Sequence, residues 1–229
     1  MIRIRILCLI LGYVFGLFQT GVIYGKYTNY DLRKHGSGNA GMTNAIRTRG
    51  WKAGIIVFIG DNLKAVLAIV IVWLLFREKY PDMVKLFEFY AALGVVLGHD
   101  YPFYLKFKGG KGIACTVGIV CSTFAFMVPI SGILFFATVI PTGYISIGSL
   151  MIVASYFVQI LVFGQLGYLG VAESVLPELY ILAAIFTFLA FFKHRGNIKR
   201  LATGTENKFA PKHEDKNDKE NKGEKGSGE

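Results

Sequence analysis

Hydrophobic residues follow one another along this chain in long runs, and the polar residues are gathered between them. The clearest runs cover residues 4–24, 53–76 and 179–192, and a weaker one covers 84–101. Residues 112–163 contain no Lys, Arg, Asp or Glu. Apolar runs of about 18 residues are long enough to cross a bilayer as a helix. The pattern therefore predicts an all-α integral membrane protein with several spans.

Basic residues between the runs predict the orientation, because cytoplasmic loops are enriched in Lys and Arg. The segments after the first, third and last runs are basic and are expected inside. The segment around Glu173 and Glu178 has no basic residue and is expected outside. The uncharged block then needs an odd number of spans, and three fit its length, with breaks near Pro129 and Pro141. The result is about seven spans, with the N-terminus outside and the C-terminus cytoplasmic.

Composition narrows the possible partners. Of the 229 residues, 53% are hydrophobic and 17% charged, which leaves no room for a separate soluble domain. The net charge is +10, but no soluble face is left on which these charges could bind nucleic acid. The charge suits anionic lipid headgroups or a small anionic substrate. Arg3 and Arg5 argue against an outside N-terminus, but the basic segment after the first run outweighs them. Residues 1–208 are expected to form one domain, and the charged tail 209–229 to be disordered.

Three polar segments fall on the same predicted membrane face: residues 36–50, 98–112 and 193–208. Residues 36–50 and 193–208 combine Gly with Asn, Ser or Thr and with Lys or Arg. Residues 98–112 combine Gly with a cluster of lysines. Glycine lets backbone N–H groups approach an anion closely, and Lys or Arg neutralises its charge. The three segments therefore predict a phosphate-binding site at the cytoplasmic surface.

Common phosphate motifs do not account for these segments. Gly36, Gly38 and Gly41 form a GxGxxG, but apolar helical runs surround them in place of the βαβ unit of a dinucleotide fold. A Walker A loop is excluded because Leu105 stands where it needs Gly and Gly112 where it needs Ser or Thr. The carboxylates of the three segments are few and scattered, so neither a metal nor another cofactor is expected.

Together the segments resemble the bacterial acyl-phosphate:glycerol-3-phosphate acyltransferase family, PlsY. GSGNAGMTNAIR, GHDYPFYLKFKGGKG and HRGNIKRLATGTE match its patterns GSGNxGxTNxxR, GHxxPxxLxFKGGKG and HRxNIxRLxxGxE, in order, over about residues 1–208. The resemblance implies a seven-helix enzyme of the bacterial inner membrane with its active site at the cytoplasmic face. It implies acyl transfer from acyl-phosphate to the 1-hydroxyl of sn-glycerol 3-phosphate, giving lysophosphatidic acid and phosphate. This reaction is the first acylation of phospholipid synthesis.

The three motifs supply the candidate site residues. The candidate catalytic residues are Ser37, Arg47, Lys111, His194 and Asn197. The candidate substrate-binding residues are Gly38, Asn39, Thr43, Asn44, Lys108, Gly109 and Gly110. Arg47 can bind one substrate phosphate bidentately, and Lys111 with the backbone of the two glycines suits the other. The sequence leaves open which cation serves which substrate.

Two steps of the chemistry remain open at this stage. An acyl-phosphate is already activated, so direct attack by the glycerol hydroxyl, with Ser37 as a hydrogen-bond donor, is favoured over an acyl-serine intermediate. His194 could act as general base. The resemblance favours the alternative, in which a substrate phosphate accepts the proton and His194 and Asn197 hold glycerol 3-phosphate.

For some polar residues, the sequence favours a structural role over a role in substrate binding. Asp61 and Lys64 lie on one helical face inside a run, and a mutual ion pair in the bundle interior is favoured over a substrate role. His99 is as well suited to a structural hydrogen bond as to ligand binding, and Glu206 is expected to order the last segment. A transporter of a phosphorylated small molecule is the rival class, but it usually shows an internal repeat and a site at mid-membrane.

Overall fold

The computed structural model describes residues 1–209, and within that range the chain is helical with no strand. The α-helices are α1 Ile2–Gly16, α2 Thr20–Thr28, α3 Met42–Phe76, α4 Val84–Asp100, α5 Ile113–Thr123, α6 Val128–Thr142, α7 Ile145–Gln165, α8 Leu176–Lys193 and α9 Arg195–Ala202. Four 3₁₀ turns, η1 Leu32–Lys34, η2 Phe103–Leu105, η3 Ala125–Met127 and η4 Glu173–Val175, complete the secondary structure of this part. The all-α prediction is confirmed, whereas the prediction of a disordered tail lies outside the described residues, except for Phe209.

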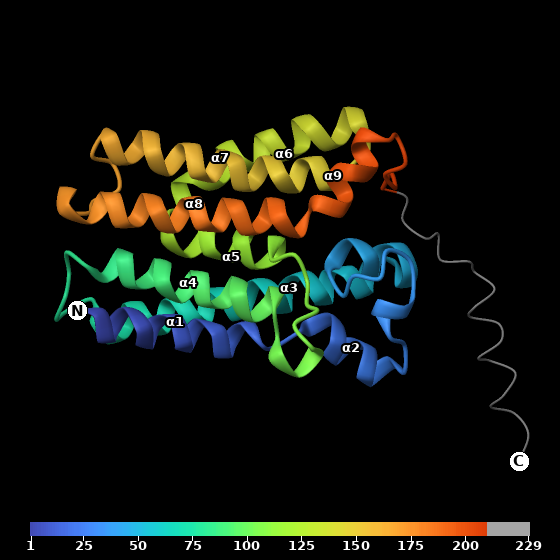
Figure 1. The fold of residues 1–229 in the computed structure, drawn as a ribbon, viewed down its shortest axis with the longest axis horizontal. Coiled ribbons are helices and arrows are strands. Elements are labelled where there is room, and N and C mark those ends of the chain that lie inside the picture. Colours follow the sequence, from blue (N-terminus) through green and yellow to red (C-terminus); the bar gives the residue numbers. More distant parts are fainter. Residues whose placement is uncertain (210–229) are drawn as a thin grey trace, which may run out of the picture.

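The long helices run side by side in one bundle, and α2, α9 and the polar loops gather at the end opposite the N-terminus (Figure 1). Helix α1 packs along α4, α3 packs on α4 and α5, and α7 packs on α6 and α8. Phe89 of α4 lies at the centre, with ring centroids 5.9 Å from Phe124, 6.4 Å from Tyr156 and 6.1 Å from Phe186. Buried aromatic contacts thus join α4 to α7 and α8.

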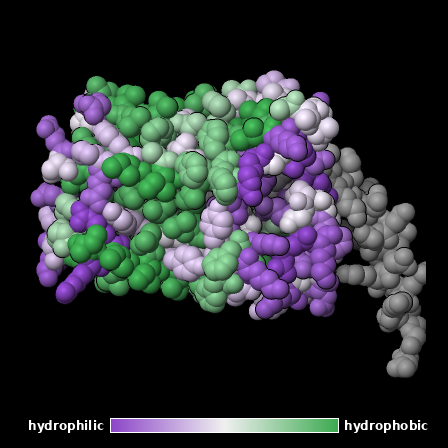
Figure 2. Space-filling model, viewed as in Figure 1, coloured by the Kyte–Doolittle hydropathy of each residue, from purple (hydrophilic) through white to green (hydrophobic). Residues whose placement is uncertain are grey.

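On the face shown in Figure 2, hydrophobic residues cover the middle of the bundle and polar residues gather toward both ends. Within residues 1–209, five helical segments are long and apolar enough to cross a membrane: Ile2–Thr28, Met42–Phe76, Ala125–Thr142, Ile145–Gln165 and Glu173–Lys193. Helix α5 is apolar but has only 11 residues, and α4 has 17. Five spans are therefore supported by length and composition, and the count of about seven stays a prediction.

The uncharged block folds into three helices, of which α6 and α7 lie in segments long enough to span a membrane and α5 is shorter. Pro129 lies in the first turn of α6, where its missing N–H has no helical partner to lose, and Pro141 lies in the last turn. Gly143 then closes α6 with a φ of 74°, a left-handed conformation that favours glycine. Proline and glycine together set the break between α6 and α7.

The first apolar run, by contrast, is not the continuous helix predicted over 4–24. Helix α1 ends at Gly16 and α2 begins at Thr20, so the chain unwinds at residues 17–19. The buried Gln19 amide donates to Gly16 O at 3.2 Å and to His99 O at 2.9 Å. Lys64 Nζ donates to Phe18 O at 2.6 Å. These side chains satisfy carbonyl groups that the broken helix leaves without partners, which an apolar environment requires.

The predicted ion pair between Asp61 and Lys64 is confirmed. Lys64 Nζ lies 2.9 Å from Asp61 Oδ1, and both side chains are buried. The Thr20 hydroxyl also donates to Asp61 Oδ1, at 3.0 Å. Lys64 Nζ lies 2.7 Å from His99 Nδ1, so the neutral imidazole accepts a hydrogen bond from the ammonium group. His99 therefore has a structural role beneath the helix break, within a polar cluster that consists of Gln19, Thr20, Asp61, Lys64 and His99 and is called the buried network below.

Candidate active site

The three polar segments meet around one cleft of about 360 Å³ at the polar end of the bundle. Its lining residues come from all three segments: Ser37, Gly38, Asn39, Gly109, Gly110, Lys111, Lys193, Arg195, Gly196, Asn197 and Arg200. Four of these side chains are basic. The convergence predicted from the motifs is thus confirmed, and seven of the twelve candidate residues are in the lining.

Each segment leads into the first turn of a helix. Helix α3 begins at Met42, α5 at Ile113 and α9 at Arg195, each a few residues after cleft-lining positions or among them. The first turn of a helix has backbone N–H groups without helical acceptors and carries partial positive charge. Helix N-termini and basic side chains therefore favour an anion in the same cleft.

Asn44 organises the first segment rather than facing the cleft. Its side chain is 2% exposed, and its Oδ1 accepts from Ser37 N at 2.8 Å. Its Nδ2 donates to the carbonyl oxygens of Leu32, His35 and Asn39 at 2.8–3.0 Å. The amide is therefore occupied within the loop, and the structure does not leave it free for a substrate. It holds Ser37 exposed at the cleft, where the Ser37 hydroxyl makes no hydrogen bond to residues 1–209.

A chain of hydrogen bonds fixes Lys111 on the other side. Lys111 Nζ donates to Asn197 Oδ1 at 2.6 Å, and Asn197 Nδ2 donates to Glu206 Oε1 at 2.7 Å. Glu206 also accepts from Arg200 Nε at 2.7 Å and from the Ser146 hydroxyl at 3.1 Å. Glu206 therefore ties α9 and the segment after it to α7, in agreement with the ordering role predicted for it. These residues, Lys111, Ser146, Asn197, Arg200 and Glu206, are called the cleft network.

The charges of the cleft network influence one another. Burial lowers the pKa of Lys111 to about 8, Glu206 opposes that shift, and Arg200, Lys193 and Arg47 favour it. Burial disfavours ionisation of Glu206, but the hydrogen bonds from Asn197, Arg200 and Ser146 bring its pKa below the usual value. At neutral pH, the part of the chain that the structure describes thus places one compensating carboxylate and several ammonium and guanidinium groups at the cleft. The excess positive charge suits a phosphate.

His194 lies at the junction of α8 and α9 and is 2% exposed, just behind the lining residues. Its Nδ1 is 2.8 Å from Ala190 O, so Nδ1 carries the proton and Nε2 is an acceptor. Burial, followed by the charge of Lys111, lowers the pKa of His194 to about 4. The imidazole is therefore neutral at pH 7 and able to accept a hydrogen bond from a hydroxyl group.

The amides of Gly109 and Gly110 are not available to a phosphate, which corrects the sequence prediction. Gly109 N donates to Asp100 O and Gly110 N to His99 O, each at 3.1 Å. Glycine is required there for space, because a Cβ at Gly110 would overlap the His99 imidazole. The backbone N–H groups of Lys111 and Gly112, which follow these glycines, make no hydrogen bond within residues 1–209.

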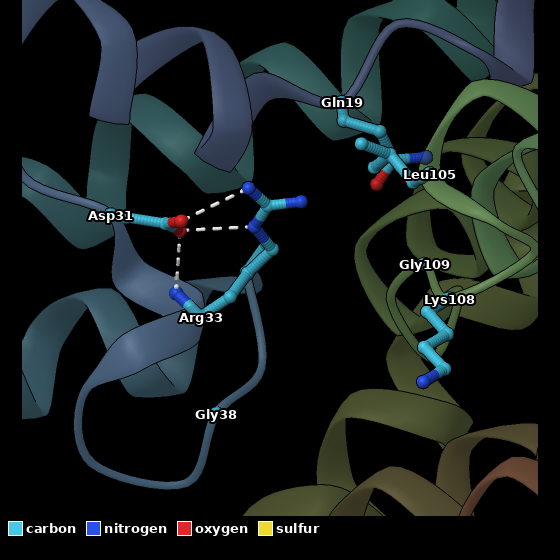
Figure 3. Close-up of a pocket in the computed structure, with 8 residues that line it drawn as sticks. Gln19, Asp31, Arg33, Gly38, Leu105, Lys108 and Gly109 are labelled. Atoms are coloured by element: carbon cyan, nitrogen blue, oxygen red, sulfur yellow. Dashed lines mark hydrogen bonds and ion pairs between the residues drawn. The ribbon is translucent and has the colours of Figure 1, made fainter.

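Other predicted residues lie near the cleft without lining it. Arg47 and Thr43 are half-buried on the first turns of α3, and within residues 1–209 the Arg47 guanidinium makes no side-chain hydrogen bond or ion pair. Lys108 lines a neighbouring cavity (Figure 3). Conversely, sequence reasoning missed Lys193, Arg195, Gly196 and Arg200 as cleft residues. The signal for Arg200 was its position three after Asn197, on the same helical face.

The fold and the cleft define an all-helical integral membrane protein with a strongly basic cleft at one end of the bundle. The family described as glycerol-3-phosphate acyltransferase matches residues 6–204. The chain belongs to this glycerol-3-phosphate acyltransferase family.

Individual relatives agree over nearly the whole chain. It is 37% identical over 215 residues to a glycerol-3-phosphate acyltransferase of Mycoplasmopsis synoviae, covering 91% of this chain and 96% of the relative. It is 39% identical over 212 residues to that of Alkaliphilus metalliredigens, covering 91% and 98%. Among solved structures, the glycerol 3-phosphate form of PlsY (YgiH), an integral membrane glycerol 3-phosphate acyltransferase, is similar with a TM-score of 0.77 and 30% identity, covering 90% of this chain and 96% of that one. The lysophosphatidic acid form of PlsY gives a TM-score of 0.75.

Proposed function

We propose that the protein transfers a fatty acyl group from an acyl-phosphate to the 1-hydroxyl of sn-glycerol 3-phosphate. The products are 1-acyl-glycerol 3-phosphate (lysophosphatidic acid) and phosphate, and the reaction is the first acylation step of phospholipid biosynthesis. The observation that carries the proposal is the cleft of about 360 Å³, in which four basic side chains and three helix N-termini surround one polar space. Membership of the family, and the ligands named for the PlsY structures, support glycerol 3-phosphate as the acceptor.

Acyl-phosphate as the donor is supported by the size and charge of the available space. A second cavity of about 350 Å³ adjoins the cleft, and both contain cations. Two such spaces suit two small phosphate headgroups. Among residues 1–209, no aromatic side chain is in the lining of either cavity, whereas aromatic walls would favour the adenine of an acyl-CoA.

In this mechanism the residues position the substrates and stabilise charge. Lys111, Asn197 and Arg200 hold glycerol 3-phosphate, and Arg47 adds positive charge from behind the cleft wall. The neutral Nε2 of His194 accepts the hydrogen bond of the attacking hydroxyl and orients it. The hydroxyl oxygen bonds to the acyl carbon, the bond from that carbon to the phosphate oxygen breaks, and the hydroxyl proton ends on the released phosphate.

Direct attack is favoured over an acyl-serine intermediate. A nucleophilic serine needs a base within hydrogen-bond reach. Within residues 1–209, the Ser37 hydroxyl has no such partner, and the Asn44 amide holds only its backbone N–H. Ser37 therefore acts as a hydrogen-bond donor to substrate in our proposal, with Gly38 and Asn39 completing that wall.

We propose further that the bundle crosses the bacterial inner membrane about seven times, through α1 and α3–α8, with the cleft at the cytoplasmic face. The basic segments at the cleft end support this orientation. Arg5, which had argued against an outside N-terminus, is paired with Glu178 through two hydrogen bonds of 2.6 Å. Arg5 belongs to the N-terminal part of α1. The N-terminus lies at the end of the bundle opposite α9 (Figure 1). The pairing reduces the weight of Arg5 as a cytoplasmic signal.

The test is a turnover assay on the purified protein in lipid nanodiscs. Glycerol 3-phosphate is supplied with palmitoyl-phosphate or with palmitoyl-CoA, and released phosphate and lysophosphatidic acid are measured. We expect turnover with palmitoyl-phosphate alone. Equal turnover with palmitoyl-CoA would refute the donor assignment, and a folded protein that used neither donor but carried glycerol 3-phosphate into liposomes would be a transporter.

A further inference from the structure

The segment that follows α9 crosses the polar end of the bundle. It covers residues 203–209, lies mostly beyond the region that matches the family, and is called the strap below. Glu206 in the strap belongs to the cleft network and is bonded there to side chains of α7 and α9. Three residues later, Phe209 N donates to Gly143 O at 2.7 Å, at the turn between α6 and α7. The strap is therefore fixed at two points to the second half of the chain.

The end of the strap lies against α3, which belongs to the first half of the chain. The centroids of the Phe209 ring and the Trp51 indole are 5.6 Å apart, and their planes meet at 76°. This edge-to-face arrangement is a favourable aromatic contact. Because α3 packs on α4 and α5 while α7 packs on α6 and α8, the aromatic pair bridges helices of different halves.

Trp51 is the first residue after a break in α3. Gly50 has a φ of 80° and a ψ of 178°, a conformation that only glycine adopts readily, so residues 42–49 form a separate short helical segment. Ile46 of this segment packs directly on Gly54, where a Cβ would overlap the Ile46 side chain. The short segment is thus seated on α3, beside the residue that the strap contacts.

The short segment supports one wall of the cleft. Its Asn44 holds the loop of Ser37 through the hydrogen bond from Ser37 N. Its Arg47 lies close enough to Lys111 for the guanidinium charge to act on the ammonium group. The facing wall belongs to α9, which supplies Asn197. The strap therefore runs from one wall to the other, because it is bonded to α9 and ends on α3.

We propose that Phe209 and Trp51 are positioning residues that hold the two walls of the cleft at the separation that glycerol 3-phosphate requires. The inference rests on the proposed function. The aromatic pair secures α3 and the short segment seated on it, and Glu206 secures α9 at the other end of the strap. Neither aromatic residue lines the cleft. When the pair is lost, the cleft opens more often, and a ligand must first shift the protein back to the closed arrangement, which weakens the apparent affinity.

The dissociation constant of glycerol 3-phosphate, measured by calorimetry in nanodiscs, tests the assignment without any donor. It should rise about fivefold in Phe209→Ala and in Trp51→Ala, because a smaller fraction of the protein has the closed cleft. The double variant should bind no more weakly than either single variant, since all three lack the same contact. Phe209→Tyr keeps the ring and should retain the wild-type affinity. Asn207→Ala is the matched control, at an exposed strap residue whose side chain makes no hydrogen bond within residues 1–209.

Several results would overturn the proposal. Unchanged binding in both alanine variants would show that the pair does not set the width of the cleft, and additive losses in the double variant would show that the two rings act separately. In the turnover assay, kcat of Phe209→Ala at saturating substrate should stay within about twofold of wild type, because bound substrate restores the closed cleft. A fall in kcat as large as the fall in kcat/KM would contradict a role in positioning the empty cleft.

Tryptophan fluorescence separates this proposal from the proposed function. The chain has two tryptophans, so Trp73→Phe leaves Trp51 as the single emitter. In that background, Phe209→Ala should shift the emission to longer wavelength and increase quenching by acrylamide, because the indole loses the ring beside it. Asn207→Ala should change neither. An unchanged spectrum in Phe209→Ala would refute the strap contact even if the turnover assay confirmed the acyltransferase. A shifted spectrum with weaker binding of glycerol 3-phosphate would support the proposal even if no acyl group were transferred.

Discussion

The buried network and the cleft network are both polar, but they differ in how their charges are balanced. In the buried network, Lys64 faces one carboxylate, one imidazole and backbone carbonyls, and its donors are used within the protein. In the cleft network, Glu206 is the one carboxylate within residues 1–209 that is bonded to Asn197 and Arg200, while three further basic side chains line the open space. Polarity within a membrane bundle therefore does not identify a site by itself. An excess of one charge beside an open space does.

The largest effect should come from breaking the buried network. Lys64→Met leaves the Asp61 carboxylate buried without its cation, which costs about 3–5 kcal/mol in free energy of unfolding. We expect this variant to lose most of its folded yield, measured by size exclusion and by SDS unfolding in mixed micelles. The double variant Asp61→Asn/Lys64→Met should recover much of the loss, because it removes the uncompensated charge. A single variant as stable as the wild type would show that the network is not structural.

Breaking the cleft network should lower the activity strongly and change the stability little, the reverse of what is expected for the buried network. Lys111→Met removes a cation that a phosphate needs, so kcat/KM should fall by about 100- to 1,000-fold. The free energy of unfolding should change by no more than about 1 kcal/mol, because the loss is one hydrogen bond to Asn197. Lys106→Met, at an exposed lysine of the same loop, serves as control and should retain activity. A large loss of stability in Lys111→Met would place this lysine with Lys64 rather than with the ligand.

The smallest expected effect is a pH dependence of kcat/KM, which further distinguishes the cleft network from the buried network. Lys111 has a pKa of about 8 in the free protein, so its cationic form is lost as the pH rises through that value. kcat/KM should therefore decline above about pH 8. Bound phosphate stabilises the ammonium form, so the decline in kcat should occur at a higher pH than the decline in kcat/KM. Identical inflections in both, or an inflection that persists in Lys111→Met, would assign the titration to another group.

Sequence patterns predicted the features that depend on composition and local chemistry. Helices α3, α4 and α8 contain the predicted runs because those runs are apolar and bounded by charged or glycine-rich segments. The three helices of the uncharged block followed from charge placement, with Pro129 and Pro141 at the two ends of α6. The convergence of the three motifs followed from their common predicted face.

Features that depend on distant partners were not predictable in the same way. The helix break at residues 17–19 depends on Lys64 and on the carbonyl of His99, neither of which is near it in sequence. The amides of Gly109 and Gly110 face inward because the turn folds back on α4. Asn44 belongs to a binding motif, yet its amide serves the loop. A motif gives the residues of a site, whereas their division into scaffold and contact depends on the fold.

The pair of Arg5 and Glu178 has a consequence for synthesis. The two residues are separated by 173 positions, and Glu178 also accepts from the Tyr90 hydroxyl at 2.6 Å. At about 5–20 residues per second, the ribosome makes Glu178 roughly 9–35 s after Arg5. During that interval the first helix has no acidic partner for its arginine, and its final placement waits for α8. Within residues 1–209, the last long helix, α8, thus supplies the acidic partner of the first helix.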